Sequence, residues 1–262
     1  MHDYWHKQSE KPLYPDIEWA KPEQRSLAGK LAIIGGSGHS FALPVQAHSQ
    51  ALKAGIGECR VILPDVLKKV IDGQGVDCLF VPSTKTGGMG KDAINDLKSY
   101  AIWASSLLLI GDSGRNSETA ITYEQLLGVA TPMTITRDAV DLLRDQAPQW
   151  LHRQDTTIVV TFAQLQKIFQ AVHYPKILLF SMQLSQLVET LHKFTISYPV
   201  HIITMHQNAL IIASDGEVST TPNSDNLAIW RGTIATYASV YTTHSPQKPF
   251  AALTAAVYAA TK

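Results

Sequence analysis

Short apolar runs alternate with longer amphipathic stretches from Lys30 to the end of the chain. Strands that are buried on both faces have this continuous apolar character, because the crossover helices of a parallel sheet cover both of its faces. The segments between the runs are long enough for such helices, for example 44–55, which ends at Gly55. The pattern predicts an α/β fold with a mostly parallel central sheet of eight or more strands, which include residues 31–36, 59–64, 78–82, 106–111, 132–137, 156–161, 176–180, 200–205 and 209–214.

The last of these runs leads into a different arrangement. Asp215 and Gly216 connect residues 209–214 directly to a second strand-like piece. An Asp-Gly pair between two such pieces is a hairpin signal, because both positions of the tight turn require a positive φ. We therefore expect an antiparallel edge hairpin here, followed by two closing helices at about 233–245 and 250–262.

No linker interrupts residues 30–262, so we expect them to form a single domain. Residues 1–29 are rich in Pro and charge and are expected to form an N-terminal arm. Its aromatic residues are expected to pack against a domain or subunit surface; they are Tyr4, Trp5, Tyr14 and Trp19. We expect the protein to be a homo-oligomer.

The charge balance argues against a nucleic-acid partner. Lys and Arg together number 22, as do Asp and Glu, whereas binding to phosphate backbones normally requires a clustered basic surplus. No apolar stretch reaches the length of about 18 residues that spans a membrane, and the first residues lack the apolar core of a signal peptide. Cys59 and Cys78 lie in apolar runs, as buried free thiols do. We expect a cytoplasmic protein without a structural metal or a disulfide.

Three predicted strand-to-helix turns combine glycine with polar residues: GGSGHSFALP (35–44), GDSGRNSET (111–119) and NLAIWRGTIATYAS (226–239). Ligands of parallel α/β sheets bind beyond the carboxyl ends of the strands, where a helix that begins offers free amides to an anion. None of the three is a GxGxxG or Walker motif. The first can equally be a tight turn without a ligand. In the second, Asp112 can hold a magnesium-bound phosphate, act as a base or cap the next helix.

Taken in order, these segments resemble the ribokinase-like superfamily, and within it the ADP-dependent NAD(P)H-hydrate dehydratases. GGSGHSFALP and ALKAGIGECRVILP (51–64) look like that family's GGS…GAP turn and the AGAG-plus-strand segment that follows. IGDSGR (110–115) stands where the family has GPGLGR, and PMTITRDAVDLL (132–143) is similar to PLVLDADALNLL. The resemblance covers the chain from about Lys30 onward. It implies a ribokinase-like fold and, as cofactor, ADP or ATP with Mg²⁺.

The substrate side of the family's site is partly retained. Gly114 matches a glycine of the GLG turn, and Asp138 matches the second aspartate of DADALN. Thr136 replaces the first aspartate and Asp141 replaces the asparagine. The resemblance implies substrate contacts from Gly35, Gly36, Ser37, Pro44, Gly114 and Asp138.

The nucleotide side departs from the family at several motifs. The adenylate-binding KGxGT segment falls at 205–209 and keeps neither its Lys nor its glycines, and the TPHPGE segment at 161–166 has no histidine. The GTGD turn falls at 232–235, where Ala235 replaces the aspartate that the family uses as general base. An alanine cannot take a proton, and a general base contributes roughly 10²–10⁴-fold in rate. The residues left to bind the nucleotide are His206, Asn208, Arg231, Gly232 and Thr233.

Two functional readings follow. In the first, the chain keeps a nucleotide- or dinucleotide-type pocket and acts by binding, with impaired catalysis. In the second, it is an active NAD(P)H-hydrate dehydratase (a lyase) or a small-molecule kinase. Asp112 or Asp138 then substitutes for the missing base. His39 and His206 are further acid–base candidates, and Arg231 is a candidate to bind the phosphate. Each of these residues also has an ordinary structural interpretation: a helix cap for Asp112, a loop hydrogen-bonder for Asp138, exposed polar residues for the histidines.

Overall fold

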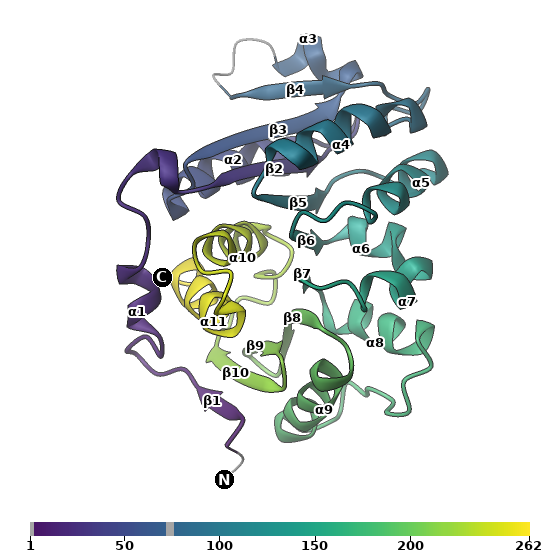
Figure 1. Ribbon diagram of the computed structural model, residues 1–262. Helices are drawn as coiled ribbons and strands as arrows, with labels where there is room; N and C mark the ends of the chain where they lie inside the picture. The colour runs from purple at the N-terminus through teal and green to yellow at the C-terminus, as the bar shows by residue number, and fades with distance from the viewer. Residues whose placement is uncertain (1–2, 72–75) are drawn as a thin grey trace.

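The computed structural model describes residues 3–71 and 76–262. Within these ranges ten strands form one sheet, in the spatial order β1-β10-β9-β8-β7-β6-β5-β2-β3-β4 (Figure 1). The strands are β1 (Trp5–Lys7), β2 (Lys30–Gly35), β3 (Glu58–Pro64), β4 (Cys78–Val81), β5 (Ser106–Gly111), β6 (Met133–Thr136), β7 (Thr156–Val159), β8 (Val200–His206), β9 (Ala209–Ser214) and β10 (Glu217–Pro222).

The seven strands from β4 to β8 in the sheet order run parallel to one another, and β9 runs antiparallel to both β8 and β10. This confirms the prediction of a mostly parallel sheet with an antiparallel hairpin. The hairpin lies next to the edge rather than at it, because β1 pairs with the outer side of β10. The β9–β10 hairpin turns at Asp215 and Gly216, whose φ values of 50° and 83° are those of the expected tight turn.

Helices cover both faces of the sheet (Figure 1). One face packs against α2 (Ala42–Ala54), α10 (Thr233–His244) and α11 (Pro249–Ala260). The other face packs against α4 (Ile94–Trp103), α5 (Ser117–Leu126), α6 (Asp138–Leu142), α7 (Ala147–Trp150), α8 (Phe162–Ala171) and α9 (Leu184–Ser197). Among the described residues, no helix combines the length and the apolar character needed to cross a membrane.

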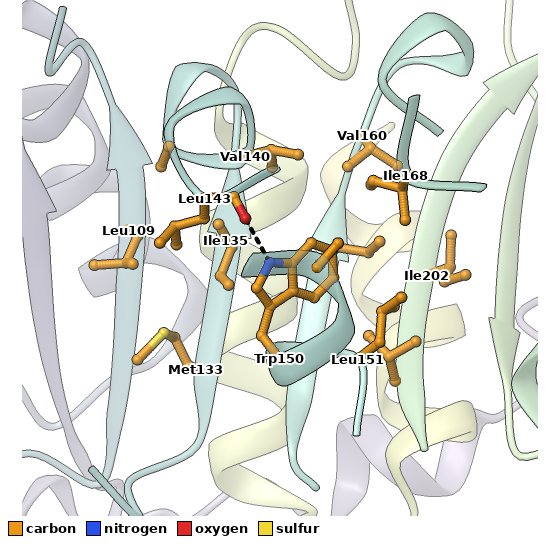
Figure 2. Close-up of a cluster of buried hydrophobic side chains, with 14 of the residues drawn as sticks. Leu109, Met133, Ile135, Val140, Leu143, Trp150, Leu151, Val160, Ile168 and Ile202 are labelled. Carbon is orange, nitrogen blue, oxygen red and sulfur yellow. Dashed lines mark hydrogen bonds between the residues drawn. The ribbon is translucent and has the colours of Figure 1, made fainter. Parts of the chain in front are cut away.

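Trp150 lies near the centre of the second face (Figure 2). Its ring is almost fully buried among aliphatic side chains that include Ile135 and Ile202. The indole Nε1 donates a hydrogen bond to the carbonyl oxygen of Leu143 at 2.9 Å. A buried tryptophan stabilises a core of this kind when its only polar group has a partner, as it has here.

The N-terminal arm adds a strand to the sheet, because β1 pairs in parallel with β10. Tyr4 stacks on His192 with ring centroids 3.7 Å apart, and the Trp5 Nε1 donates to Thr220 Oγ1 at 3.0 Å. Helix α1 (Pro15–Trp19) then crosses α10 and α11 and buries Ile17 against them. Trp19 departs from the expectation of packing, because 84% of its surface is exposed.

The predicted strand at 176–180 is wrong. This segment, KILLF, is irregular and lies between α8 and α9. Strands β7 and β8, which precede and follow it in the sequence, pair directly with each other. Only Leu178 of its apolar side chains is buried; Ile177 and Phe180 are 74% and 65% exposed.

Candidate functional site

The carboxyl ends of β5 and β6 bring together Asp112, Gly114 and Asp138, as the parallel arrangement requires. Asp138, the first residue of α6, accepts the amide of Asp112 on Oδ1 at 2.8 Å and the amide of Gly114 on Oδ2 at 3.0 Å. Burial raises the pKa of Asp138 above its ordinary value, against the opposing effect of these two hydrogen bonds. Asp138 is therefore a partly buried carboxyl group that fixes the turn after β5.

Arg137 occupies the space between β5 and α10, and no sequence motif drew attention to it. Its Nη2 donates to Asp112 Oδ1 at 2.7 Å and its Nη1 donates to the carbonyl oxygen of Trp230 at 2.5 Å. The guanidinium carbon also lies 5.2 Å from the centroid of the Trp230 ring. Arg137 thus connects the end of the central sheet to the segment that enters α10.

Both partners of this ion pair have a strained backbone. Asp112 and Arg137 have φ values of 57° and 55°, which non-glycine residues rarely adopt. Such strain costs of order 1–3 kcal/mol per residue and persists only where surrounding contacts compensate for it. The compensating contact here is the ion pair itself. The exposed fraction of the side chain is 22% for Arg137 and 8% for Asp112.

The helix-cap interpretation of Asp112 is wrong for the next helix. Asn116 caps α5, since its side chain accepts the amides of Glu118 and Thr119. Asp112 instead accepts the amide of Leu43 in the first turn of α2, at 3.4 Å through Oδ2. The carboxylate is therefore already in contact with two elements of the protein.

The first glycine turn contacts the second. The amide of Gly36 donates to the carbonyl oxygen of Gly111 at 2.8 Å, and Gly36 has a φ of 82°. A Cβ at Gly35 would lie 2.4 Å from that same carbonyl oxygen, so the two turns meet backbone to backbone. Ser37 is buried and its amide donates to Ser40, while Pro44 lies in the first turns of α2. The residues of the substrate-side prediction therefore gather at this edge.

Two glycines of the second turn differ in their surroundings. A Cβ at Gly111 would lie 2.1 Å from Asp138 Oδ1, so this position has no room for a side chain. A Cβ at Gly114 would have no atom within 4 Å. The open side of the turn is thus at Gly114, where a ligand can approach the backbone.

The start of α10, which corresponds to the predicted phosphate and base segment, is apolar and closely packed. Gly232 caps the helix with a φ of 76°, and a Cβ there would lie 2.8 Å from Leu43. Ala235 is fully buried and Ile234 nearly so. Thr233 uses its hydroxyl to accept Gln50 Nε2 at 3.0 Å. No residue of the first turn carries a carboxylate.

The remaining nucleotide-side residues do not form one site. His206 is buried, contrary to the exposed interpretation; its Nε2 lies 2.8 Å from the carbonyl oxygen of Met182 and its ring stacks on Phe162 at 4.7 Å. Asn208 lies in the β8–β9 turn with a φ of 58°. Arg231 is exposed and pairs with Asp225 at 2.8 Å, so it does not reach into the space that Arg137 occupies.

His39 is exposed and lies in the loop that follows the first glycine turn. Among residues 3–71 and 76–262, no three His, Cys, Asp or Glu side chains are placed to hold a metal ion. His2 and His6 have the four-residue spacing of a helical metal pair, but His2 lies outside the described residues. His6 itself pairs with Glu217 at 2.6 Å.

Comparison with known proteins agrees with the fold. No protein-family model matches the chain. A stretch of 119 residues, 44% of the chain, is 29% identical to the bifunctional NAD(P)H-hydrate repair enzyme of Methanothermobacter thermautotrophicus, and the match spans 23% of that protein. The chain therefore corresponds to less than a quarter of this relative's length.

Several solved structures share the architecture. A ribokinase-like superfamily protein from Enterococcus faecalis is similar over 100% of this chain and 87% of its own, with a TM-score of 0.73 and 14% identity. The ADP/ATP-dependent NAD(P)H-hydrate dehydratase of Bacillus subtilis, co-crystallised with ATP and Mg²⁺, gives a TM-score of 0.62 at 12% identity over 97% of this chain and 88% of its own. A phosphomethylpyrimidine kinase from Clostridium difficile gives 0.54 at 10% identity, over 88% of this chain and 97% of its own. The chain has a ribokinase-like fold, as its sequence motifs indicated.

Proposed function

We propose that this ribokinase-like chain is a catalytically impaired relative of the NAD(P)H-hydrate dehydratases that acts by binding a nucleotide-type ligand. The observation that carries the proposal is Ala235, which is fully buried at the start of α10 where the resemblance implies the general base. Ile234 beside it is also buried. Neither side chain can accept a proton, and neither can move into the site without emptying part of the core.

The two substitute bases are engaged in structural contacts. Asp112 is bound by Arg137 and by the amide of Leu43, and each oxygen of Asp138 accepts a backbone amide. A carboxylate that took a proton would weaken these hydrogen bonds. The contacts therefore favour a structural role for both aspartates.

ADP or ATP with Mg²⁺, the cofactors that the resemblance implies, do not fit the residues present. His206 points into the core toward Met182, and Arg231 pairs with Asp225 on the surface. The Arg137 guanidinium lies against the carbonyl oxygen of Trp230, at the entry to α10.

The ligand belongs instead to the substrate side, at Gly35, Gly36 and Gly114. The backbone is open to a ligand at Gly114, where a Cβ would contact nothing, while Gly35 and Gly36 are buried behind it. Such glycine turns suit the close approach of a dinucleotide phosphate. We therefore propose an NAD(P)-type dinucleotide as the ligand class.

A second candidate function is an active lyase or kinase that uses Asp138. The raised pKa of this buried carboxyl group favours it, because a general base is most effective when its pKa lies near the working pH. The two functions differ in a measurable way, since only the second predicts turnover that is lost in Asp138→Asn.

The test combines binding and turnover. The purified protein is denatured and the released small molecules are identified by mass spectrometry, and its melting temperature is measured with NADPH hydrate, NADPH, ADP and ATP in millimolar Mg²⁺. A ligand present at a hundred times its Kd stabilises the native state by about 2.7 kcal/mol. We expect stabilisation by the dinucleotides, little or none by ADP or ATP, and no formation of NADPH from its hydrate.

Ala235→Asp is the informative variant. We expect it not to restore turnover, because the packed start of α10 lacks phosphate-binding room as well as the base. Nucleotide-dependent stabilisation together with NADPH formation by the unmodified protein would overturn the proposal, and loss of that activity in Asp138→Asn would then assign the base.

A further inference from the structure

Residues 176–180 form an exposed apolar surface in the segment that connects α8 to α9 (Figure 1). Ile177, Leu179 and Phe180 are 74%, 57% and 65% exposed, whereas Leu178 is buried. Side chains that point outward at 177 and 179 and inward at 178 follow the alternation of an extended chain. The segment therefore has the composition and the side-chain pattern of a strand, although it does not belong to the sheet.

The backbone of this segment is also largely without partners. Within the described residues, no amide from 176 to 180 donates a hydrogen bond to the chain. Two carbonyl groups hold the segment in place: that of Leu178 accepts Gln166 Nε2 at 2.8 Å, and that of Leu179 accepts the amide of Met182 at 3.0 Å. Free amides along an extended apolar segment are the property of an edge strand, which is a template for pairing with another chain.

Two hollows lie beside the exposed side chains. One, of about 500 Å³, has Phe169 and Ile177 in its wall, and the other, of about 380 Å³, has Gln186 in its wall. Tyr174 and Lys176 line both, so the two hollows border the segment directly. Protruding side chains and recesses therefore lie on one face. A face that carries both can pack against a copy of itself, as an isologous interface requires.

The size and the charge of this face suit a second copy of the chain. At their exposed fractions, Ile177, Leu179 and Phe180 present roughly 400 Å² of apolar surface. Each side of a standard interface buries about 800 Å², of which a little over half is apolar, so these three side chains supply most of the apolar area that a stable dimer needs. Residues 177–183 carry no charge, and two copies can therefore meet here without like-charge repulsion.

We propose that residues 176–180 form the centre of a two-fold interface between two copies of this chain. Identical segments that meet across such an axis run antiparallel, and alignment about Leu178 places Ile177 opposite the second copy's Leu179. This pairing supplies acceptors for the free amides and covers the exposed apolar side chains. The interface does not depend on the proposed function, because Ile177, Leu179 and Phe180 take no part in the proposed ligand site.

The test is the mass of the full chain in solution, measured by light scattering after size-exclusion chromatography at micromolar concentration. We expect the parent to have twice the mass of one chain. Ile177→Lys and Leu179→Lys each introduce a charge from both copies at the axis. Each should raise the Kd of the dimer, measured by sedimentation equilibrium, about a hundredfold. A parent that is monomeric at micromolar concentration would overturn the proposal.

Ile102→Lys is the matched control, because Ile102 is 84% exposed but lies on α4, outside this face. It should leave the Kd of the dimer unchanged. Since all three side chains are exposed, the far-UV circular dichroism of each variant should match that of the parent. Dimers of Ile177→Lys and Leu179→Lys as tight as those of the parent would place the interface elsewhere and refute the assignment, as would equal dissociation by Ile102→Lys.

Discussion

The two edges of the sheet arrange their polar groups differently. At the carboxyl edge, where this fold class binds ligands, Asp112, Arg137 and Asp138 are bonded to one another or to the backbone, although Arg137 Nε is buried without a partner in the described chain. At the amino edge, Thr157 and His201 line a small cavity, and His201 Nδ1 lies 2.8 Å from Ser214 Oγ. The position of a group in a fold therefore does not decide whether it is available to a ligand; its partners within the chain do.

The difference has a physical origin in how each edge is built. The carboxyl edge consists of turns, where a positive φ at Asp112 and Arg137 aims side chains back at neighbouring turns. The amino edge consists of strand ends in register, so side chains of adjacent strands stand side by side and point the same way. Thr134, Thr157 and His201 therefore stand side by side on β6, β7 and β8, and the two threonine hydroxyls can donate as well as accept.

The largest expected effect on stability comes from disrupting the hydrogen bonds between Asp138 and the turn after β5. Gly111→Ala places a Cβ 2.1 Å from Asp138 Oδ1 at a φ of 90°, so it adds backbone strain and displaces a carboxylate from two amides. We expect a loss of about 3–5 kcal/mol in the free energy of unfolding, measured by urea denaturation. Gly114→Ala is the control, because it has a similar φ of 73° but open space, and should cost only about 1–2 kcal/mol. Equal losses in both variants would contradict the role of Asp138.

A smaller effect is expected from removing the positive charge at the same edge. Arg137→Met leaves the nearly buried carboxylate of Asp112 without its partner, which should destabilise the protein by about 3 kcal/mol in the same assay. Arg231→Met also removes one partner of an Arg–Asp pair, but that pair is on the surface, and we expect its denaturation curve to match that of the parent. If Arg137→Met is as stable as Arg231→Met, the carboxyl edge is not held by its ion pair.

The smallest expected effect is at the amino edge and concerns the pH dependence that His201 gives to stability. Because burial lowers the pKa of His201, the unfolded chain binds a proton there that the folded chain does not, between the lowered pKa and the ordinary value near 6.5. The free energy of unfolding should fall as the pH drops through this window, and the contribution of His201 is fully present above it. Melting temperatures from pH 8 to 5 should therefore fall less steeply in His201→Gln. Burial lowers the pKa of His48 and His244 as well, so part of the slope should remain; a slope identical to that of the parent would contradict the buried, neutral state of His201.

Most of the fold could be predicted from the sequence. A strand that is buried on both faces is a continuous apolar run, and this run can be recognised without knowing which strands lie beside it. The failure at 176–180 shows the limit of this signal. KILLF has the composition of a buried strand, yet only Leu178 is buried, and its carbonyl oxygen accepts a hydrogen bond from Gln166 at 2.8 Å. Whether such a run joins the sheet depends on which strands pair, and no local pattern contains that information.

The site was predictable only in part. Gly111, Gly114 and Asp138 meet because parallel strands end at one edge, and this follows from the strand order. The sequence did not indicate the role of Arg137. Its contacts with Asp112 and Trp230 depend on a positive φ, which an arginine rarely adopts and which cannot be predicted from the residue type. The row of Thr134, Thr157 and His201 left only a weak sequence signal, the alternate threonines of MTIT, because the match between strands requires their register.

The pairing of β1 with β10 sets an order for folding during synthesis. Trp5 is opposite Val218 in the sheet, and Ile17 packs against α11, so the arm has no docking surface until about two hundred further residues have been synthesised. Contacts of such sequence separation close late, because the loop entropy must be overcome before they contribute. Until then the edge of β10 is uncovered, and an exposed edge strand can pair with another chain. Docking of the arm is therefore expected late in folding, when β1 covers the middle of β10 and becomes the edge strand itself.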